Sequence, residues 1–276
     1  MLRWLTGVVA LAAALGVTIT DLRAWDDARY PDLKGAWRRP GAAQWDPTKP
    51  RMLGQGAPLT SEYQAIFKAN MADTETGGQA YNPQVRCLPG GMPRVLIAYD
   101  PIQFIVTPDL TVMRTDHLTE TRHIFTDGRN FPAKINPSFE GYSIGRWVDE
   151  DGDGRFDLLE VETRGMKGPR IIDADGIPLA ADNATLVKEQ IFLDKANPDL
   201  LHDRITTIDH AFTRPWTVTR GYRRERNPVW TEEPCSEGNR YLIIGKETYF
   251  VGADRELMPT RKDQPPPDLK FFDQPK

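Results

Sequence analysis

The sequence predicts an all-β protein whose antiparallel strands close into an up-and-down barrel. From residue 92 onward, short runs rich in branched and aromatic residues alternate with turn residues such as the Asp127-Gly128 pair. Only one segment, residues 61–73, has a persuasive helical pattern. Strands that follow one another along a chain usually protect their edges by closing into a barrel or by packing as a sandwich, and we favour the barrel.

The N-terminal residues 1–24 have the organisation of a secretory signal peptide. Arg3 supplies a positive charge, residues 4–19 form an apolar stretch, and residues 22–24 are a tolerable cleavage site. Because Leu22 is not a small residue, an uncleaved membrane anchor is the alternative. We expect a periplasmic or secreted protein that has no stable membrane insertion after cleavage.

The remaining chain divides into three predicted parts. Residues 25–91 are irregular because prolines interrupt any long element, apart from a short strand at 33–38 and the helix at 61–73, where Ser61 and Gln64 fit a capping box. Residues 251–276 form a proline-rich tail. The barrel occupies residues 92–250, with strands expected at 95–98, 103–107, 110–113, 121–125, 142–148, 158–163, 185–193, 204–210 and 216–222.

The chain has two cysteines, Cys87 and Cys235. In an oxidising compartment an even pair is more often bridged than free, so we expect a disulfide between them. The bridge closes a loop of about 150 residues and contributes about 4–5 kcal/mol in the chain-entropy model.

An acidic segment at residues 149–160 matches the calcium-loop pattern D-x-[DN]-x-[DN]-G-x5-E. Both flanks have the composition of strands, which places the loop at the tip of a β-hairpin and not between the helices of an EF-hand. The alternative is an acidic turn that binds only water. The expected ligands of a structural Ca²⁺ are carboxylates, one main-chain carbonyl (from Arg155) and a bidentate Glu, from Asp149, Asp151, Asp153, Arg155, Asp157 and Glu160.

Composition and motifs exclude several functional classes. A net charge of −4 and a pI near 5.7 argue against nucleic-acid binding. The chain has no G-x-S-x-G elbow, and neither cysteine lies in a nucleophile motif. It also has no glycine-rich phosphate loop, and we expect no organic cofactor. The candidates for acid–base catalysis are weak: His123, Asp127 and His210.

Aromatic side chains of the predicted strands could line a cavity for a small hydrophobic ligand, because barrels of eight or more strands can enclose one. The alternative is that they fill the barrel core themselves. The residues concerned are Phe125, Tyr142, Trp147, Trp216 and Tyr222.

Two resemblances bear on this interpretation. Gly35-x-Trp37 resembles the opening-strand motif of lipocalins, in which the tryptophan plugs the closed end of the barrel. The segments at 87–94, 126–129, 143–147 and 214–217 resemble the motif series of a family of exported, uncharacterised bacterial proteins, over about residues 33–245. That family implies no established activity or active site. Members often have a shorter hairpin in place of the acidic loop, which implies a peripheral role for calcium.

Three functional classes follow from these observations. The first is an exported barrel that binds a small hydrophobic molecule and carries a structural calcium loop. The second is an enzyme, a hydratase, isomerase or hydrolase, that acts on such a molecule. The third is a structural or interaction protein of the cell envelope.

Overall fold

The computed structural model describes residues 26–76, 78, 80, 82–117, 120–168, 170–231, 235, 240–252, 254–268 and 270. The signal peptide predicted at residues 1–24 lies outside the described residues, as does part of the C-terminal tail. No helix in the described part of the chain is both long enough and apolar enough to cross a membrane.

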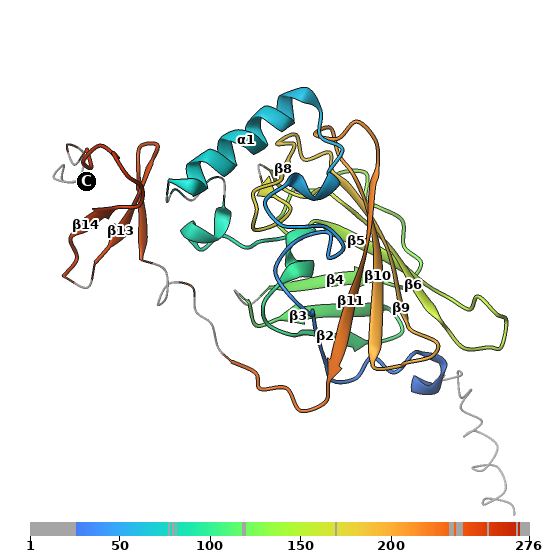
Figure 1. The fold of residues 1–276 in the computed structure, drawn as a ribbon. Coiled ribbons are helices and arrows are strands. Elements are labelled where there is room, and N and C mark those ends of the chain that lie inside the picture. The colour runs from blue at the N-terminus through green and yellow to red at the C-terminus, as the bar shows by residue number, and fades with distance from the viewer. Residues whose placement is uncertain are drawn as a thin grey trace, which may run out of the picture.

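Nine strands form a closed barrel in the order β1-β11-β10-β9-β6-β5-β4-β3-β2 (Figure 1). The closed barrel confirms the predicted all-β class. Its strands are β1 (Ala36–Arg38), β2 (Ile102–Val106), β3 (Leu110–Thr115), β4 (Thr121–Phe125), β5 (Tyr142–Val148), β6 (Leu158–Arg164), β9 (Leu186–Leu193), β10 (Leu200–Ile208) and β11 (Trp216–Glu225).

The pairing is antiparallel at every junction of the barrel except one. Strands β4 and β5 are parallel, with Ile124 opposite Ser143 and Phe125 opposite Ile144. Residues 126–141 carry the chain from the end of β4 back to the barrel end where β4 began, so β5 runs in the same direction. The sheet is therefore mixed, and the strictly up-and-down arrangement expected from the sequence does not hold at this junction.

Side chains alternate between the barrel interior and its surface, as the two-residue period of a strand requires. Strand β9 shows this clearly, because Val187, Glu189 and Ile191 are buried while Lys188 is exposed. Trp37, the tryptophan of the Gly-x-Trp motif, is fully buried, and its indole N–H donates to the carbonyl oxygen of Leu33 at 3.1 Å.

The helix α1 (Ser61–Glu75) is confirmed with slightly wider bounds than predicted. Thr60 is its N-cap, and its hydroxyl accepts a hydrogen bond from the amide of Tyr63 at 3.4 Å. The cap is therefore one residue earlier than the predicted Ser61–Gln64 box. Buried Phe67 and Asn70 anchor the helix against the rest of the fold, and the Asn70 amide donates to the Gly176 carbonyl at 2.9 Å.

The expected strand at residues 95–98 is wrong, because this segment lies in the short 3-10 helix η4 (Arg94–Ile97). The amide of Val95 donates to the Gly91 carbonyl at 2.8 Å, and that of Leu96 donates to Pro93 at 3.0 Å. Four consecutive apolar residues do not distinguish a fully buried turn of helix from a buried strand. The other 3-10 helices are η1 (Asp27–Arg29), η2 (Gly54–Gly56) and η3 (Pro83–Arg86).

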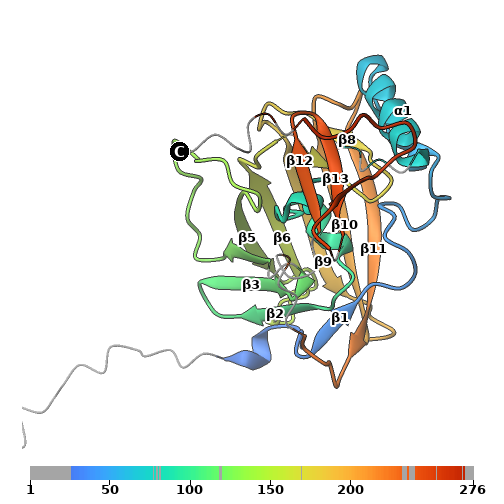
Figure 2. The same ribbon diagram turned by 90° about the vertical axis from the view of Figure 1, so that its left-hand side faces the viewer.

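Strands after residue 240 form a separate sheet, whereas we expected the barrel to extend to residue 250. The sheet stands to one side of the barrel in Figure 1 and in front of it in Figure 2. This sheet has the order β12-β13-β14, and a Gly245 turn with φ of 64° joins its first two strands. Its strands are β12 (Tyr241–Ile244), β13 (Glu247–Val251) and β14 (Leu257–Pro259), and a two-stranded hairpin consists of β7 (Arg170–Ile171) and β8 (Pro178–Leu179).

A fully buried ion pair crosses the barrel interior. The guanidinium of Arg122 on β4 donates to both carboxylate oxygens of Glu189 on β9, at 2.9 and 2.5 Å. Its other N–H groups donate to Ser143 on β5 at 3.0 Å and to Thr163 on β6 at 2.8 Å. Arg122 thus connects four strands through charge-assisted hydrogen bonds.

We predict that Arg122→Met lowers the free energy of unfolding by about 3–5 kcal/mol, because Glu189 is left as an uncompensated buried charge. Urea denaturation measures the loss. The matched control is Arg146→Met, which removes an exposed guanidinium paired with Glu160 at 2.6 Å and costs at most about 1 kcal/mol. Replacing Arg122 and Glu189 together by Met restores much of the loss; equal effects of the two single Arg variants would contradict this account.

Candidate functional site

A hollow of about 170 Å³ lies at the barrel end where β3 ends and β4 begins. We call it the mouth pocket. Its polar lining comes from Asn82, Gln84, Arg94, Tyr99, His117 and Glu120, and its apolar lining includes Val95, Ile97 and Ala98.

Helix η4 forms one wall of the mouth pocket and also closes the barrel. Its four residues are all buried. The hydroxyl of Tyr222, inside the barrel, donates to the Leu96 carbonyl at 2.8 Å, and Arg39 donates to the carbonyls of Ile97 and Ala98 at 2.9 and 3.0 Å. These bonds fix the wall to the barrel, so the pocket is held by packed elements and not by a free loop.

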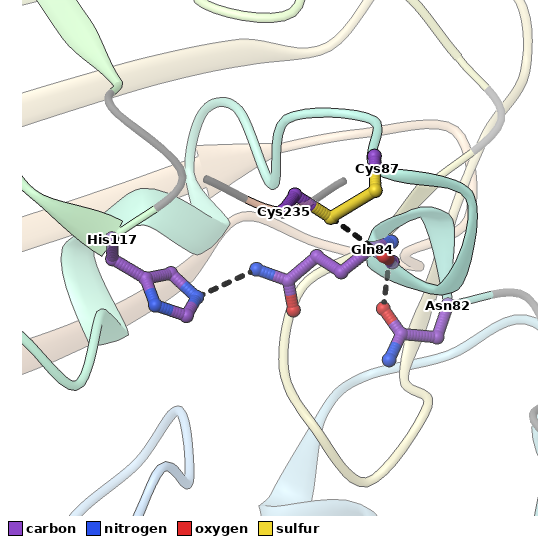
Figure 3. Close-up of a disulfide and its surroundings, with 5 residues drawn as sticks. All are labelled: Asn82, Gln84, Cys87, His117 and Cys235. Carbon is purple, nitrogen blue, oxygen red and sulfur yellow. Dashed lines mark hydrogen bonds between the residues drawn. A yellow bond between two sulfur atoms is a disulfide. The ribbon is translucent and has the colours of Figure 1, made fainter. Parts of the chain in front are cut away.

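The disulfide predicted between Cys87 and Cys235 is confirmed, and it lies next to the pocket (Figure 3). Its Cα atoms are 5.4 Å apart. Gln84, three residues before Cys87, extends its side-chain amide to His117, with 2.9 Å between Gln84 Nε2 and His117 Nε2. Since the amide nitrogen can only donate, Nε2 of His117 is the acceptor, and the proton of a neutral ring is on Nδ1. The bridge therefore ties residues 84–87 to the C-terminal region beside this histidine.

Two opposite charges face the mouth pocket. The buried guanidinium of Arg94 donates to Gln84 Oε1 at 2.9 Å and to the main-chain carbonyl of Asp173. Burial lowers the pKa of Arg94, and the nearby Asp173 and Glu120 carboxylates oppose that shift. Glu120 accepts hydrogen bonds from the amides of Gly90 at 2.6 Å and Gly91 at 2.8 Å.

Glycine is required at position 91 and leaves room for the carboxylate at position 90. Gly91 has a φ of 61°, and a Cβ there would lie 2.4 Å from the carbonyl oxygen of Phe139. A Cβ on Gly90 would lie 3.2 Å from the Glu120 carboxylate. Glycine at both positions allows the backbone to approach the carboxylate closely enough to donate two amides.

A second carboxyl, that of Glu140, lies beside Glu120. Both of its oxygens are buried, with no donor within hydrogen-bond distance among the described residues. Burial and the adjacent Glu120 raise the pKa of Glu140 to about 9. A carboxyl with this pKa holds its proton at neutral pH, so Glu140 is protonated beside Glu120, which accepts the two main-chain amides.

The three residues proposed from sequence as acid–base groups are not brought together. His123 is exposed on the outer surface of β4. Asp127 is exposed and bonded to Arg129 on the same turn, and this bond lowers the pKa of Asp127. His210 is exposed and pairs with Asp182, which raises the pKa of the imidazole.

The five aromatic residues proposed to line a ligand cavity also separate. Phe125 and Tyr142 stack on each other with centroids 5.1 Å apart, on the outward-facing positions of β4 and β5. Trp147 and Trp216 lie at opposite ends of the barrel, because β5 ends at Val148 whereas β11 begins at Trp216. Tyr222 lies inside, where it borders a cavity of only about 10 Å³.

The acidic loop lies at the tip of the β5–β6 hairpin, as the sequence predicts. Carboxylate oxygens of Asp149, Asp151 and Asp153 lie within 4.8 Å of one another. Asp149 also accepts the amides of Gly152, Asp153 and Gly154 at 2.7, 3.2 and 2.9 Å, which holds the loop tightly curled.

Two of the other three expected calcium ligands have protein partners for their carboxylates. Asp157 accepts the Glu150 amide at 3.0 Å. Glu160, already on β6, pairs with Arg146 at 2.6 Å. The third, Arg155, donates its amide to Asp153 at 2.8 Å, a bond that does not use the main-chain carbonyl expected to bind calcium.

Sequence reasoning missed Arg94, His117, Glu120 and Glu140. The Gly90-Gly91 pair was an available signal, since adjacent glycines permit close backbone approach, but it does not identify a carboxylate partner thirty residues away.

Comparison with protein-family models finds no match to the chain, and comparison with curated proteins finds none either.

We predict that Glu140→Gln flattens the pH dependence of stability. The folded protein retains the Glu140 proton up to a pKa of about 9, whereas an unperturbed Glu loses it near 4.5. The folded state binds more protons between these values, so the free energy of unfolding falls as pH rises from about 5 to about 9.

The variant has no such proton to lose and should reduce that fall by on the order of a few kcal/mol. Urea denaturation across this pH range measures it, with exposed Glu75→Gln as the control. Parallel pH profiles for the wild type and Glu140→Gln would show that Glu140 titrates normally.

Proposed function

We propose that the protein is an exported β-barrel whose mouth pocket binds a small molecule. The molecule is largely apolar and carries one polar group. One observation carries the proposal: the mouth pocket combines buried Arg94 and Glu120 with the apolar Val95 and Ile97 in a hollow of about 170 Å³. A concave, partly apolar site with a few convergent polar groups is the usual form of a ligand site.

The mouth pocket is not the ligand site expected from sequence, which was a cavity inside the barrel. The barrel interior near Tyr222 is filled by side chains and holds a cavity of about 10 Å³, roughly the space of one water molecule. Binding of a small hydrophobic molecule stays a prediction, and the mouth pocket is the site that favours it.

Export rests on two features. Residues 1–24 have signal-peptide organisation, and the Cys87–Cys235 bridge is typical of proteins that mature in an oxidising compartment.

Native mass spectrometry of the mature protein, purified from the periplasm without detergent, tests ligand binding. We predict a retained small molecule in the wild type and its loss in Ala174→Trp, because exposed Ala174 borders the mouth pocket and an indole there blocks it. The matched control is Ala133→Trp, at an exposed position on the β4–β5 connection. Retention of the molecule by Ala174→Trp would place the site elsewhere.

An enzyme is the second candidate function, and the Glu120–Glu140 pair favours it. Glu120 borders the pocket, and the adjacent Glu140 has a pKa raised to about 9; a carboxyl that keeps its proton next to a second carboxyl is suited to general acid–base chemistry. Glu120→Gln should then abolish conversion of the retained molecule; conversion at the wild-type rate would exclude Glu120 from the reaction.

Structural calcium binding by the acidic loop is part of the proposal. The convergence of Asp149, Asp151 and Asp153 supports it, because Ca²⁺ prefers several carboxylate oxygens. Calcium should raise the melting temperature of the wild type and of Glu150→Gln, which changes an exposed loop carboxylate outside this trio. The melting temperature of Asp151→Asn should not rise with calcium. A wild-type melting curve that is unchanged by millimolar calcium would contradict calcium binding by the loop.

A further inference from the structure

The Arg94 guanidinium, which lines the mouth pocket, has hydrogen-bond donors that the protein does not use. One N–H of Nη1 donates to the main-chain carbonyl of Asp173, and one of Nη2 donates to Gln84 Oε1 at 2.9 Å. The Nε–H and the second N–H of each terminal nitrogen have no acceptor within the described ranges of the chain. Because Arg94 is only 7% exposed, the mouth pocket is where an acceptor for these donors can lie.

Two further side chains with unused donors line the same hollow (Figure 3). Asn82 is the N-cap of η3, and its Oδ1 accepts the Gln84 amide at 3.1 Å. The Nδ2 of Asn82 has no acceptor in the part of the chain that the structure describes. Gln84 Nε2 donates one of its hydrogens to His117 and keeps the other. Donors from three side chains are therefore available to a molecule in the mouth pocket.

The acceptor capacity of the lining is more fully used. Glu120 is the acidic residue of the lining, and its carboxylate oxygens accept the amides of Gly90 at 2.6 Å and Gly91 at 2.8 Å. The side-chain oxygens of Gln84 and Asn82 also accept hydrogen bonds from the protein. A ligand therefore meets unused donors, and acceptors that already have partners.

The charges around Arg94 favour an uncharged ligand group. Burial lowers the pKa of Arg94, whereas the Asp173 and Glu120 carboxylates raise it, so these carboxylates already oppose its positive charge. An anionic ligand group next to Arg94 would lie near both carboxylates, and a cationic one would lie near the guanidinium itself. Like charges repel strongly in a buried site, because little water screens them. A neutral acceptor avoids both costs.

The rest of the lining is apolar or aromatic. Val95, Ile97 and Ala98 form an apolar wall. Tyr99 is 62% exposed at the pocket, where the Arg39 guanidinium lies 4.9 Å from its ring centroid and holds the ring in place. A flat apolar body, such as an aromatic ring, packs well against this wall and against the tyrosine ring.

We infer that the ligand of the mouth pocket is an uncharged carbonyl compound, such as a ketone or ester, whose oxygen accepts a hydrogen bond from Arg94. The inference rests on the proposed function, since it names the chemical class that the mouth pocket binds. A carbonyl oxygen brings lone pairs and no donor, so it matches a lining with unused donors. An alcohol adds another donor, and a hydrocarbon leaves the buried donors of Arg94 without an acceptor, which costs binding free energy.

An NMR titration of the isotope-labelled wild-type protein with five phenyl compounds of similar size tests the inference. Acetophenone carries a carbonyl, 1-phenylethanol a hydroxyl, benzoate a carboxylate, benzylamine an ammonium group, and ethylbenzene no polar group. Acetophenone should have the lowest Kd, at least about tenfold below ethylbenzene, benzoate and benzylamine, because a hydrogen bond to a charged donor is worth that factor. The alcohol should bind more weakly than acetophenone.

Arg94→Met tests the named donor, because methionine keeps an unbranched side chain but has no N–H group. This variant should bind acetophenone and ethylbenzene with Kd values within about threefold of each other. The matched control is Arg146→Met, at an exposed position of β5, which should keep the wild-type ranking. The wild-type ranking of the five compounds needs no variant, and it decides the inference if Arg94→Met does not fold.

Failure of this inference can be told from failure of the proposed function. If Ala174→Trp abolishes binding but another of the five compounds equals or exceeds acetophenone, the carbonyl inference is wrong and the mouth pocket is still the ligand site. If Ala174→Trp binds acetophenone as the wild type does, the compound lies elsewhere and both are contradicted. No binding of acetophenone at millimolar concentration would overturn the inference, whereas a molecule retained in native mass spectrometry would still support the proposed function.

Discussion

The buried pair of Arg122 and Glu189 is the interaction on which the rest of the barrel depends. The parallel junction of β4 and β5 has only two register pairs, so main-chain bonding there is short. Arg122 crosses this junction with a hydrogen bond to Ser143 and continues to Thr163 on the next strand. The side-chain network thus joins strands across a short ladder, and the desolvation cost of both charges is offset only while the pair is complete.

The same network reaches the barrel mouth. Glu120 precedes Arg122 by two residues, and Arg122 opposes the rise in the pKa of Glu140. Deeper in the barrel, Asp203 is buried next to Glu189, and burial followed by repulsion from Glu189 raises its pKa well above the usual value. Arg122 thus acts on two acidic pairs, and in each pair burial and the neighbouring carboxyl raise the pKa of one member, Glu140 or Asp203. Glu120, of the first pair, lines the mouth pocket.

Rigid attachment distinguishes the mouth pocket from the other hollows on the surface. Tyr222 and Arg39 bond the carbonyls of η4 and the residue after it from within the barrel, and the Cys87–Cys235 bridge holds the opposite wall through residues 84–87. A site held in this way is pre-organised, so a ligand loses less free energy to ordering the protein when it binds.

Local patterns in the sequence predicted the barrel class and helix α1, because strand alternation and capping residues are short-range signals. The disulfide followed instead from the presence of one cysteine pair in a chain expected to be exported. The β12–β13 hairpin carried such a signal in its Ile244-Gly245-Lys246 turn, yet nothing local shows that it leaves the barrel. The cluster of Asp149, Asp151 and Asp153 in the hairpin loop could also be predicted, because its members are two residues apart in sequence.

The mouth pocket was not predictable in this way. Arg94, His117 and Glu120 meet only after the closed sheet brings the end of β3 against residues 82–99, and the pKa of Glu140 depends on a neighbour twenty residues away in sequence. The same reason explains the aromatic residues. They are of one chemical type but lie in different parts of the barrel, so they do not form the cavity that their number suggested.

A crystal structure of the mature protein with its retained small molecule would test the central claim most directly. The account predicts that the molecule lies in the mouth pocket, with its polar group within hydrogen-bond distance of Arg94 or Glu120 and its apolar part against Val95 and Ile97. A molecule enclosed inside the barrel beside Asp203 and Tyr222 would contradict it, because that position requires the packed interior to open.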